Sequence, residues 1–133
     1  MISLDTSALV RFLTDDEPAV AERVAAAIDG DEQVHVSALA LLELVHVLRG
    51  KPYARRNPDL ADVLVDLLTH ENIVLSGLDR DIATVAIRAA RERSPRHLAD
   101  ALIAAAAHEA GTRELWTTDT EFATDLVPVT QLG

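Results

Sequence analysis

The sequence predicts a three-layer α/β/α fold with a five-stranded parallel sheet. Short apolar runs alternate with longer segments of helical periodicity along the chain. Strands that alternate with helices pair in parallel through crossover connections, which places helices on both faces of the sheet. An apolar content of 49% in 133 residues is enough for one sizeable core. We therefore expect residues 1–133 to form a single domain.

The first strand and the first helix meet at an acidic residue. Met1–Leu4 is an apolar run typical of a buried strand, and Asp5 follows it. Thr6 and Ser7 offer N-cap oxygens, and apolar residues at helical spacing come after them. We expect the chain to turn directly from strand into helix, with Asp5 at the carboxyl end of the strand.

The rest of the chain continues this alternation. Ser37 is an expected N-cap, and Ser94–Pro95 is an expected break between two helices. In chain order, the predicted elements are a helix from Pro18 to Gly30, a strand at Val34–Val36, a helix at Ala38–Arg49, a helix over Asp59–Leu68, a strand at Ile73–Leu75, a helix at Asp79–Arg93, a helix from about His97 to Ala110, a strand at Leu115–Thr117, a helical turn at Asp119–Ala123 and a strand at Val127–Val129.

Composition limits the classes of function. A formal charge of −10 disfavours non-specific adhesion to nucleic acid, although it leaves a nucleic-acid substrate open. The chain has no cysteine, which excludes disulfides and thiolate metal sites and leaves oxygen or imidazole as metal ligands. No apolar run is long enough to span a bilayer, and the N-terminus lacks a signal-peptide pattern. We expect a cytoplasmic protein with no membrane segment.

Four acidic residues stand out from a purely structural pattern. Asp5 and Asp119 each follow a strand, Glu43 shares the polar stripe of an apolar helix with His46, and Asp100 lies in the first turn of an alanine-rich helix. Each has a structural explanation as well: a helix cap for the two strand-end acids, a solvent-facing stripe for Glu43, and a complement to the helix dipole for Asp100. Taken singly, none of them decides the function.

Together, the four acids predict a metal site. Carboxylates at strand ends and on the connecting helices can converge on one crevice, where either raised pKa values or a divalent cation must relieve their repulsion. Mg²⁺ or Mn²⁺ suits such oxygen ligands and would activate a water molecule for phosphodiester hydrolysis. Thr6, Ser7 and Thr118 are candidates to hold metal-bound water or to orient the carboxylates, or else they are only caps.

Four stretches resemble the PIN domain and, within that family, the VapC-type toxins of toxin–antitoxin pairs. They are LDTSALVRFLTDDEP, SALALLELVHVLRGKPY, HLADALIAAAAHEAG and LWTTDTEF, which together span essentially the whole chain in the family's order. The resemblance implies a compact five-stranded parallel sheet and an Mg²⁺- or Mn²⁺-dependent endoribonuclease. Carried over by position, its catalytic and metal-binding acids are Asp5, Glu43, Asp100 and Asp119, assisted by Thr118 and by Ser7 or Thr6. Two residues depart slightly from the family's pattern. His97 stands where an aromatic residue often precedes the helix of the third acid, and Trp116 is a bulky residue for the fourth strand.

The resemblance also implies partners. Such toxins are commonly homodimers, and a small VapB-type antitoxin docks a C-terminal segment across the site. The apolar stripes of Ala38–Arg49 and Asp59–Leu68 are the expected docking surface, with ordinary core packing as the alternative. The basic residues expected to contact RNA are first Arg91, Arg93, Arg96 and His97, and next Arg49, Lys51, Arg55 and Arg56. The alternative for these residues is a solvated charged face.

Other classes fit less well. A receiver-like phosphoacceptor needs a lysine late in the chain, and Lys51 is the only lysine. A phosphatase with an Asp nucleophile needs a second Asp where this chain has Ser7, and one Glu43–His46 pair among five strands is too little for a di-iron bundle. A non-catalytic PIN-like module that binds DNA or RNA, or sequesters a partner, stays open. Metal-dependent RNA cleavage would distinguish the enzyme from that module.

Overall fold

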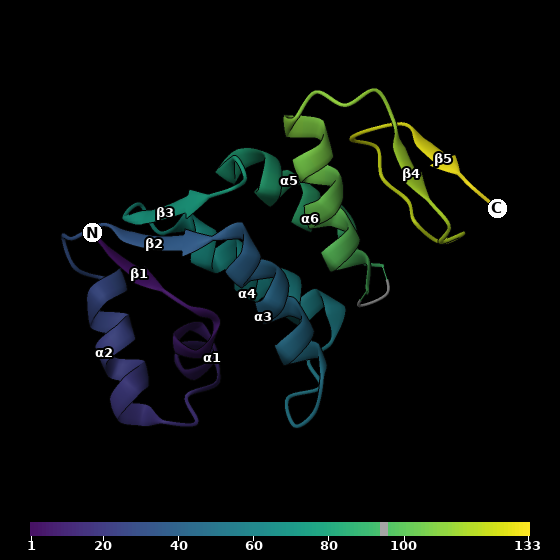
Figure 1. Ribbon diagram of the computed structural model, residues 1–133. Helices are drawn as coiled ribbons and strands as arrows, with labels where there is room; N and C mark the ends of the chain where they lie inside the picture. The colour runs from purple at the N-terminus through teal and green to yellow at the C-terminus, as the bar shows by residue number, and fades with distance from the viewer. Residues whose placement is uncertain (94–95) are drawn as a thin grey trace.

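The computed structural model describes residues 1–93 and 96–133 (Figure 1). The expected break at Ser94–Pro95 lies outside the described residues. In chain order, the elements are β1 Ile2–Leu4, α1 Thr6–Thr14, α2 Pro18–Ile28, β2 Val34–Ser37, α3 Ala38–Arg49, α4 Asn57–Thr69, β3 Ile73–Ser76, α5 Arg80–Ala90, α6 Arg96–Glu109, β4 Leu115–Thr117 and β5 Val129–Gln131. The α/β class predicted from the sequence is confirmed.

The strands form two separate parallel sheets. The first has the order β1-β2-β3, with Ile2 opposite Val34 and Val34 opposite Ile73. The second pairs β4 with β5, with Trp116 opposite Thr130. The single five-stranded sheet predicted from the sequence is therefore wrong, because β4 and β5 pair with each other and not with the first three strands.

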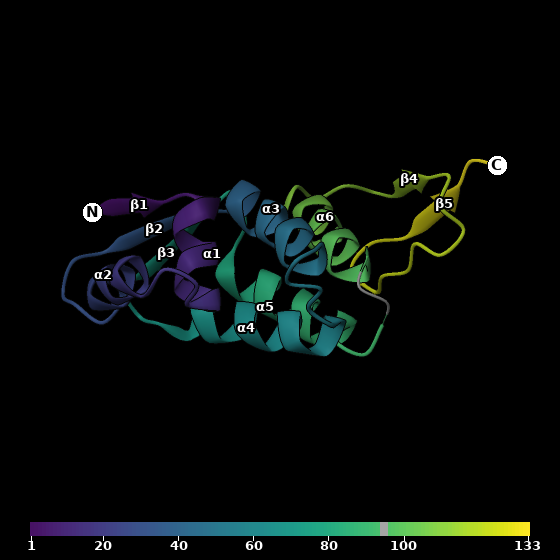
Figure 2. The same ribbon diagram turned by 90° about the horizontal axis from the view of Figure 1, so that it is seen from below.

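Helices cover one face of the three-stranded sheet. Val34 and Val36 are fully buried on that face, and Figure 2 shows α1, α2 and α4 on one side of the strands. The opposite face carries a hydrogen-bonded row, in which His35 lies between Ser3 and Ser76 with distances of 2.7 Å to each hydroxyl. The two serines are exposed. Over these strands the structure has one helical layer, where the prediction had two.

Local capping signals set several helix boundaries. The Ser37 hydroxyl accepts a hydrogen bond from the Ala40 N–H at 3.0 Å, which confirms it as the N-cap of α3. At α1 the N-cap is Asp5 itself, whose carboxylate accepts from the Ala8 N–H at 3.0 Å, and not one of the two hydroxyl residues after it. The carboxylate is a stronger acceptor and lies at the position that a cap requires.

The C-terminal region differs most from the prediction. At Asp119–Ala123, where a helical turn was predicted, the chain forms one turn closed by a hydrogen bond from the Phe122 N–H to the Asp119 carbonyl at 3.1 Å. The last strand is Val129–Gln131, two residues later than predicted. Elsewhere the shifts are small: α4 begins two residues early at Asn57, because Pro58 fits the first turn of a helix, and α5 ends at Ala90.

The core is built around α3. Its residues Leu41, Leu44 and Leu48 are buried, and the helix packs against α1, α4 and α6. Burial of each such leucine stabilises the fold by about 1.5–3 kcal/mol. Ala104 and Ala105 of α6 are also fully buried, and their small side chains allow close packing of the helices. None of the helices in the described residues is long and apolar enough to cross a membrane.

Candidate active site

Asp5 sits where β1 ends and α1 begins. Its Oδ1 atom accepts hydrogen bonds from the Ala8 N–H at 3.0 Å and from the Ser7 hydroxyl at 2.7 Å. These bonds, with the one from Ala8 contributing most, lower the pKa of the Asp5 carboxyl below its ordinary value. Neither of these two hydrogen bonds involves Oδ2. Asp5 is thus an exposed carboxylate that stays ionised at neutral pH and keeps one oxygen clear of these two donors.

Glu43 opens onto the same pocket as Asp5. Because β2 pairs with β1 and leads directly into α3, the second turn of α3 lies beside the end of β1. Both acids are exposed. Their pocket, called the acid pocket below, has a volume of about 340 Å³ and is lined by Ser3, Leu4, Asp5, Thr6, Ser37, Leu39, Ala40 and Glu43. Two of the four predicted acids therefore share one concave site.

Asp100 lies on α6, which packs against α3 and α5. Its side chain is half-buried among the buried residues Leu98, Ala99 and Ala101, and its Oδ2 atom is out of contact with solvent. Asp100 is not among the described residues that line the acid pocket. The helix next to Glu43 thus carries this third acid, but outside that pocket.

Asp119 belongs to the turn after β4. Its N–H donates to Thr117 Oγ1 at 3.0 Å, its Oδ1 accepts from the Glu121 N–H at 2.9 Å, and its carbonyl accepts from Gln131 Nε2 at 3.0 Å. Figures 1 and 2 both place β4 beyond α6, away from β1. Asp119 and the exposed Thr118 therefore lie apart from the acid pocket.

One chain does not gather the four acids into one cluster. Among residues 1–93 and 96–133, no three His, Asp or Glu side chains form a group that could hold a metal ion. Asp5 and Glu43 supply carboxylate oxygens of the kind that Mg²⁺ and Mn²⁺ prefer. The arrangement of a single copy does not fit the predicted four-acid metal site.

Several of the basic residues expected at the RNA make contacts within the chain. Arg91 binds both carboxylate oxygens of Asp62, at 2.8 and 2.9 Å. Arg93 and His97 each contact a backbone carbonyl of the segment after β4, at 2.9 and 3.1 Å. The Arg96 side chain lies outside what the structure describes. These contacts join α4, α5 and α6 to their neighbours, so RNA contact by this group stays a prediction.

Two serines of the acid pocket were not predicted as site residues. Ser3 and Ser37 line it, from β1 and from the start of α3. Ser3 interrupts an otherwise apolar strand, which is the one local sign of its position. Its bond to His35 had no local signature, because it depends on the pairing of two strands that are far apart in the sequence.

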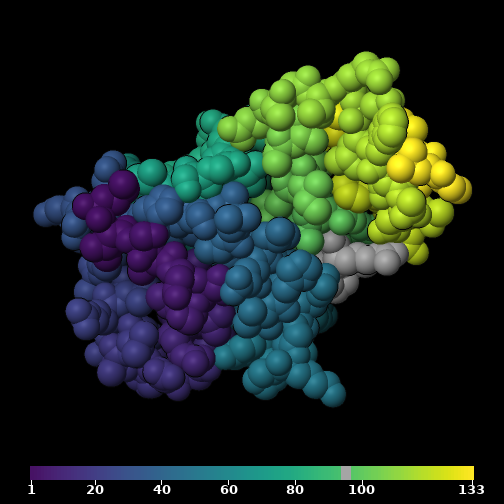
Figure 3. All heavy atoms as spheres, viewed as in Figure 1, coloured from purple at the N-terminus to yellow at the C-terminus, as the bar shows by residue number. Residues whose placement is uncertain are grey.

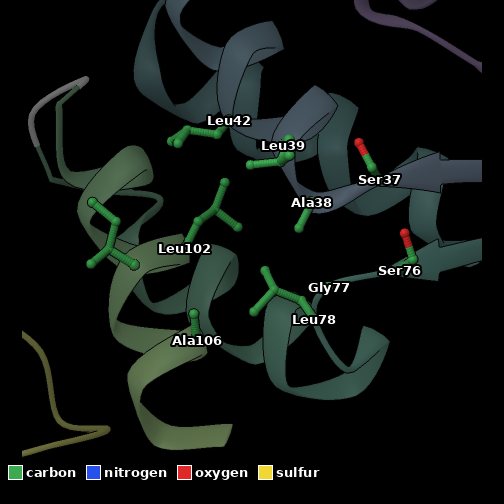
Figure 4. Close-up of a pocket in the computed structure, with 10 residues that line it drawn as sticks. Ser37, Ala38, Leu39, Leu42, Ser76, Gly77, Leu78, Leu102 and Ala106 are labelled. Carbon is green, nitrogen blue, oxygen red and sulfur yellow. The ribbon is translucent and has the colours of Figure 1, made fainter. Parts of the chain in front are cut away.

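An apolar cleft adjoins the acid pocket. Figure 4 shows Leu39 and Leu42 of α3 across from Leu102 and Ala106 of α6. The cleft has a volume of about 300 Å³, and Ser37 and Leu39 line both it and the acid pocket. The two acids thus border an apolar surface between α3 and α6.

Comparison with known protein families matches residues 2–124 to the PIN domain. A search of curated proteins finds no match to the chain. The family match covers most of the sequence and includes the acids Asp5, Glu43, Asp100 and Asp119. PIN domains are generally nucleases. With the parallel strands and six helices of its described residues and a match over nearly its full length, this chain belongs to the PIN-domain family.

Proposed function

We propose that this protein is an Mg²⁺- or Mn²⁺-dependent endoribonuclease and the toxin of a type II toxin–antitoxin pair. Membership of the PIN-domain family supports the nuclease class. The observation that carries the proposal is the acid pocket, where Asp5 and Glu43 come together from two different elements. A pocket open to solvent and lined by two carboxylates suits a cation and a phosphodiester better than an apolar ligand.

The local structure favours the ionised form of the Asp5 carboxyl. The Ser7 hydroxyl and the Ala8 N–H fix its Oδ1 and lower the pKa of the carboxyl. The partial positive charge at the N-terminus of α1 favours the same ionised form. Glu43 adds a second carboxylate on α3, where the adjacent Leu44 and Val45 are buried. Asp5 and Glu43 are therefore the residues that we assign to cation binding and catalysis in this pocket, with Ser7 as a positioning residue.

The far end of α3 offers a path for RNA. His46 and Arg49 follow Glu43 along this helix, and the Arg49 guanidinium lies 3.2 Å from His46 Nδ1. Lys51 and Arg56 are exposed just beyond the helix. In a protein with a formal charge of −10, such a local basic strip is the feature that can hold a phosphate backbone near the acids.

The antitoxin surface that we propose is the cleft beside the acid pocket. The stripes predicted for docking are mostly core, because Leu44 of α3 and Leu64 of α4 are buried. Leu39, by contrast, is 78% exposed and borders both the cleft and the acid pocket. We propose that an apolar antitoxin segment covers Leu39 and Ile103 and that an arginine from it reaches Asp5 and Glu43.

RNA cleavage by the purified protein tests the proposed function. We expect cleavage in Mg²⁺ or Mn²⁺, and none after chelation of the metal. Asp5→Asn should lower kcat/KM at least about 100-fold, which corresponds to about 2.7 kcal/mol. Asp31→Asn, at an exposed acid outside the pocket, is the matched control and should cleave as the wild type does. Binding of RNA without cleavage would instead support the non-catalytic module.

A further inference from the structure

The outer edge of β1 has no strand beside it in the described part of the chain. The Ile2 N–H donates to the Gln33 carbonyl on the β2 side, at 3.1 Å. Successive backbone groups of a strand point to opposite edges, so the N–H and carbonyl of Ser3 point outward. Ile2 is also 38% exposed. An open edge with an exposed apolar residue is a template for another strand.

β4 offers a matching edge. The Leu115 N–H donates to the Pro128 carbonyl at 2.8 Å, and the Leu132 N–H donates to the Thr117 carbonyl at 2.9 Å, both on the β5 side. The backbone groups of Trp116 therefore point to the other, open edge. A sheet of two strands is marginally stable alone, and this one leaves Trp116 63% exposed. None of the residues of β4 and β5 is fully buried, whereas parallel strands are usually covered on both faces.

Hydrogen-bond geometry fixes how these two edges fit. In a parallel pair, a residue whose N–H and carbonyl point toward the partner strand lies opposite a residue whose N–H and carbonyl point away from it. Ile2 and Val34 are such a pair: the Ile2 N–H points to β2, and the Val34 N–H points to β3. Trp116 must then lie opposite Ile2 or Leu4, on the same face. With Ile2 opposite Trp116, two exposed apolar side chains cover each other. The same register places Asp5 opposite Asp119.

Contacts within the chain hold β4 away from its own β1. The segment after β4 is fastened to the helices by Arg93, which donates to the Ala123 carbonyl, and by His108, whose Nδ1 donates to the Leu126 carbonyl, both at 2.9 Å. The turn from α6 into β4 is set by Gly111, with φ at +73°. With these contacts in place, β4 lies beyond α6 and away from its own β1 (Figures 1 and 2). In this position the open edge of β4 can pair with the β1 of a second copy.

We infer that two copies of this chain exchange their β4–β5 units, so that β4 of each copy pairs with β1 of the other. Each half then holds a parallel sheet in the order β3-β2-β1-β4-β5, with its last two strands from the other copy. Asp119 of one copy comes to lie beside Asp5 and Glu43 of the other. On this last point the inference rests on the proposed function. The exchange explains why Asp119 does not reach the acid pocket of its own copy.

Thiol cross-linking tests the exchange, because the chain contains no cysteine. Ile2→Cys and Trp116→Cys chains with different tags are expressed together and oxidised. We expect a disulfide-linked dimer with one chain of each variant. Thr130→Cys in place of Trp116→Cys is the matched control, since it lies in the same row but one strand farther from the open edge of β4, and it should give no link. The next row, Ser3→Cys with Thr117→Cys, repeats the test on the other face of the sheet.

Three outcomes would overturn the inference. One is a chain with both cysteines that closes an internal disulfide and stays monomeric by light scattering, because β4 then pairs with its own β1. The second is equal linkage through Thr130→Cys, and the third is no linkage through either row although the variants are folded.

Activity provides a separate measurement. Asp5→Asn and Asp119→Asn are each expected to be inactive alone. Expressed together, they should recover about one quarter of the wild-type rate, because half of the dimers are mixed and one of their two sites is intact. No recovery, with an active wild type, contradicts the exchange. An inactive wild type refutes the proposed function, and the cross-link then still decides the exchange.

Discussion

The Ser7 hydroxyl donates a hydrogen bond of 2.7 Å to Asp5 Oδ1, and so the first turn of α1 fixes the carboxylate at the end of β1. With the bond from the Ala8 N–H, it holds the pKa of Asp5 below its ordinary value of 3.8. The strand-to-helix turn thus does two jobs: it caps the helix and it keeps the acid charged.

Replacing Ser7 with alanine should raise the pKa of Asp5, because one of the two bonds that favour the ionised form is lost. Activity that needs the carboxylate is present above its pKa, so the acidic limb of the pH–rate profile should move to higher pH. Ser3→Ala is the control, since Ser3 lines the same pocket but bonds to His35. Identical acidic limbs for wild type and Ser7→Ala would contradict the assignment.

Asp16 links the loop after α3 to the end of α1. The Tyr53 hydroxyl donates to its carboxylate at 2.7 Å and the Thr14 hydroxyl at 2.6 Å, and these bonds, with the one from Thr14 contributing most, lower the pKa of Asp16. A lowered pKa stabilises the fold above the ordinary value of 3.8, and this contribution is lost as the pH falls through the lowered pKa. Tyr53→Phe should therefore unfold at lower urea than the wild type at neutral pH. The difference should shrink in acid, and a difference independent of pH would contradict this account.

Asn57 ties α4 to the end of α5. It is 3% exposed, and its Nδ2 donates to the carbonyls of Ala90 and Arg91, each at 2.8 Å. Asn57→Ala should lower the free energy of unfolding by about 2 kcal/mol, because the Arg91 carbonyl loses its side-chain donor and the Ala90 carbonyl keeps only the Arg93 N–H. Urea denaturation measures the loss, with the exposed Asp59→Ala as control. A change below about 0.5 kcal/mol would show that the carbonyls find other partners.

Local signals in the sequence predicted the elements well. α3 runs over Ala38–Arg49 as predicted, because Ser37 and Gly50 provide its caps, and β4 has its predicted bounds. The pairing of the strands with one another could not be predicted from such local signals. Whether β4 lies beside β1 depends on contacts such as those of Arg93 and His108 with distant carbonyls, which leave no periodic pattern in the sequence.

The same distinction applies to the site. Asp5 and Glu43 were predicted to converge, and they share a pocket because β1 pairs with β2 and β2 leads into α3. Asp119 was expected beside them on the assumption of a single sheet, and its strand belongs to the second sheet. The prediction was right for Asp5 and Glu43, because one strand pairing and one short connection determine their positions. It was wrong for Asp119, because the position of that residue depends on how the two sheets are placed relative to each other.

The most direct test of the account is RNA cleavage measured as a function of Mg²⁺ concentration for the wild type and for Glu43→Gln. Glu43 is exposed and lines the acid pocket, so the variant should fold normally. We predict saturable, Mg²⁺-dependent cleavage by the wild type, and for Glu43→Gln a loss of at least about 100-fold in kcat/KM at every Mg²⁺ concentration. Equal cleavage by the two proteins over the whole range would contradict the assignment of the acid pocket as the active site.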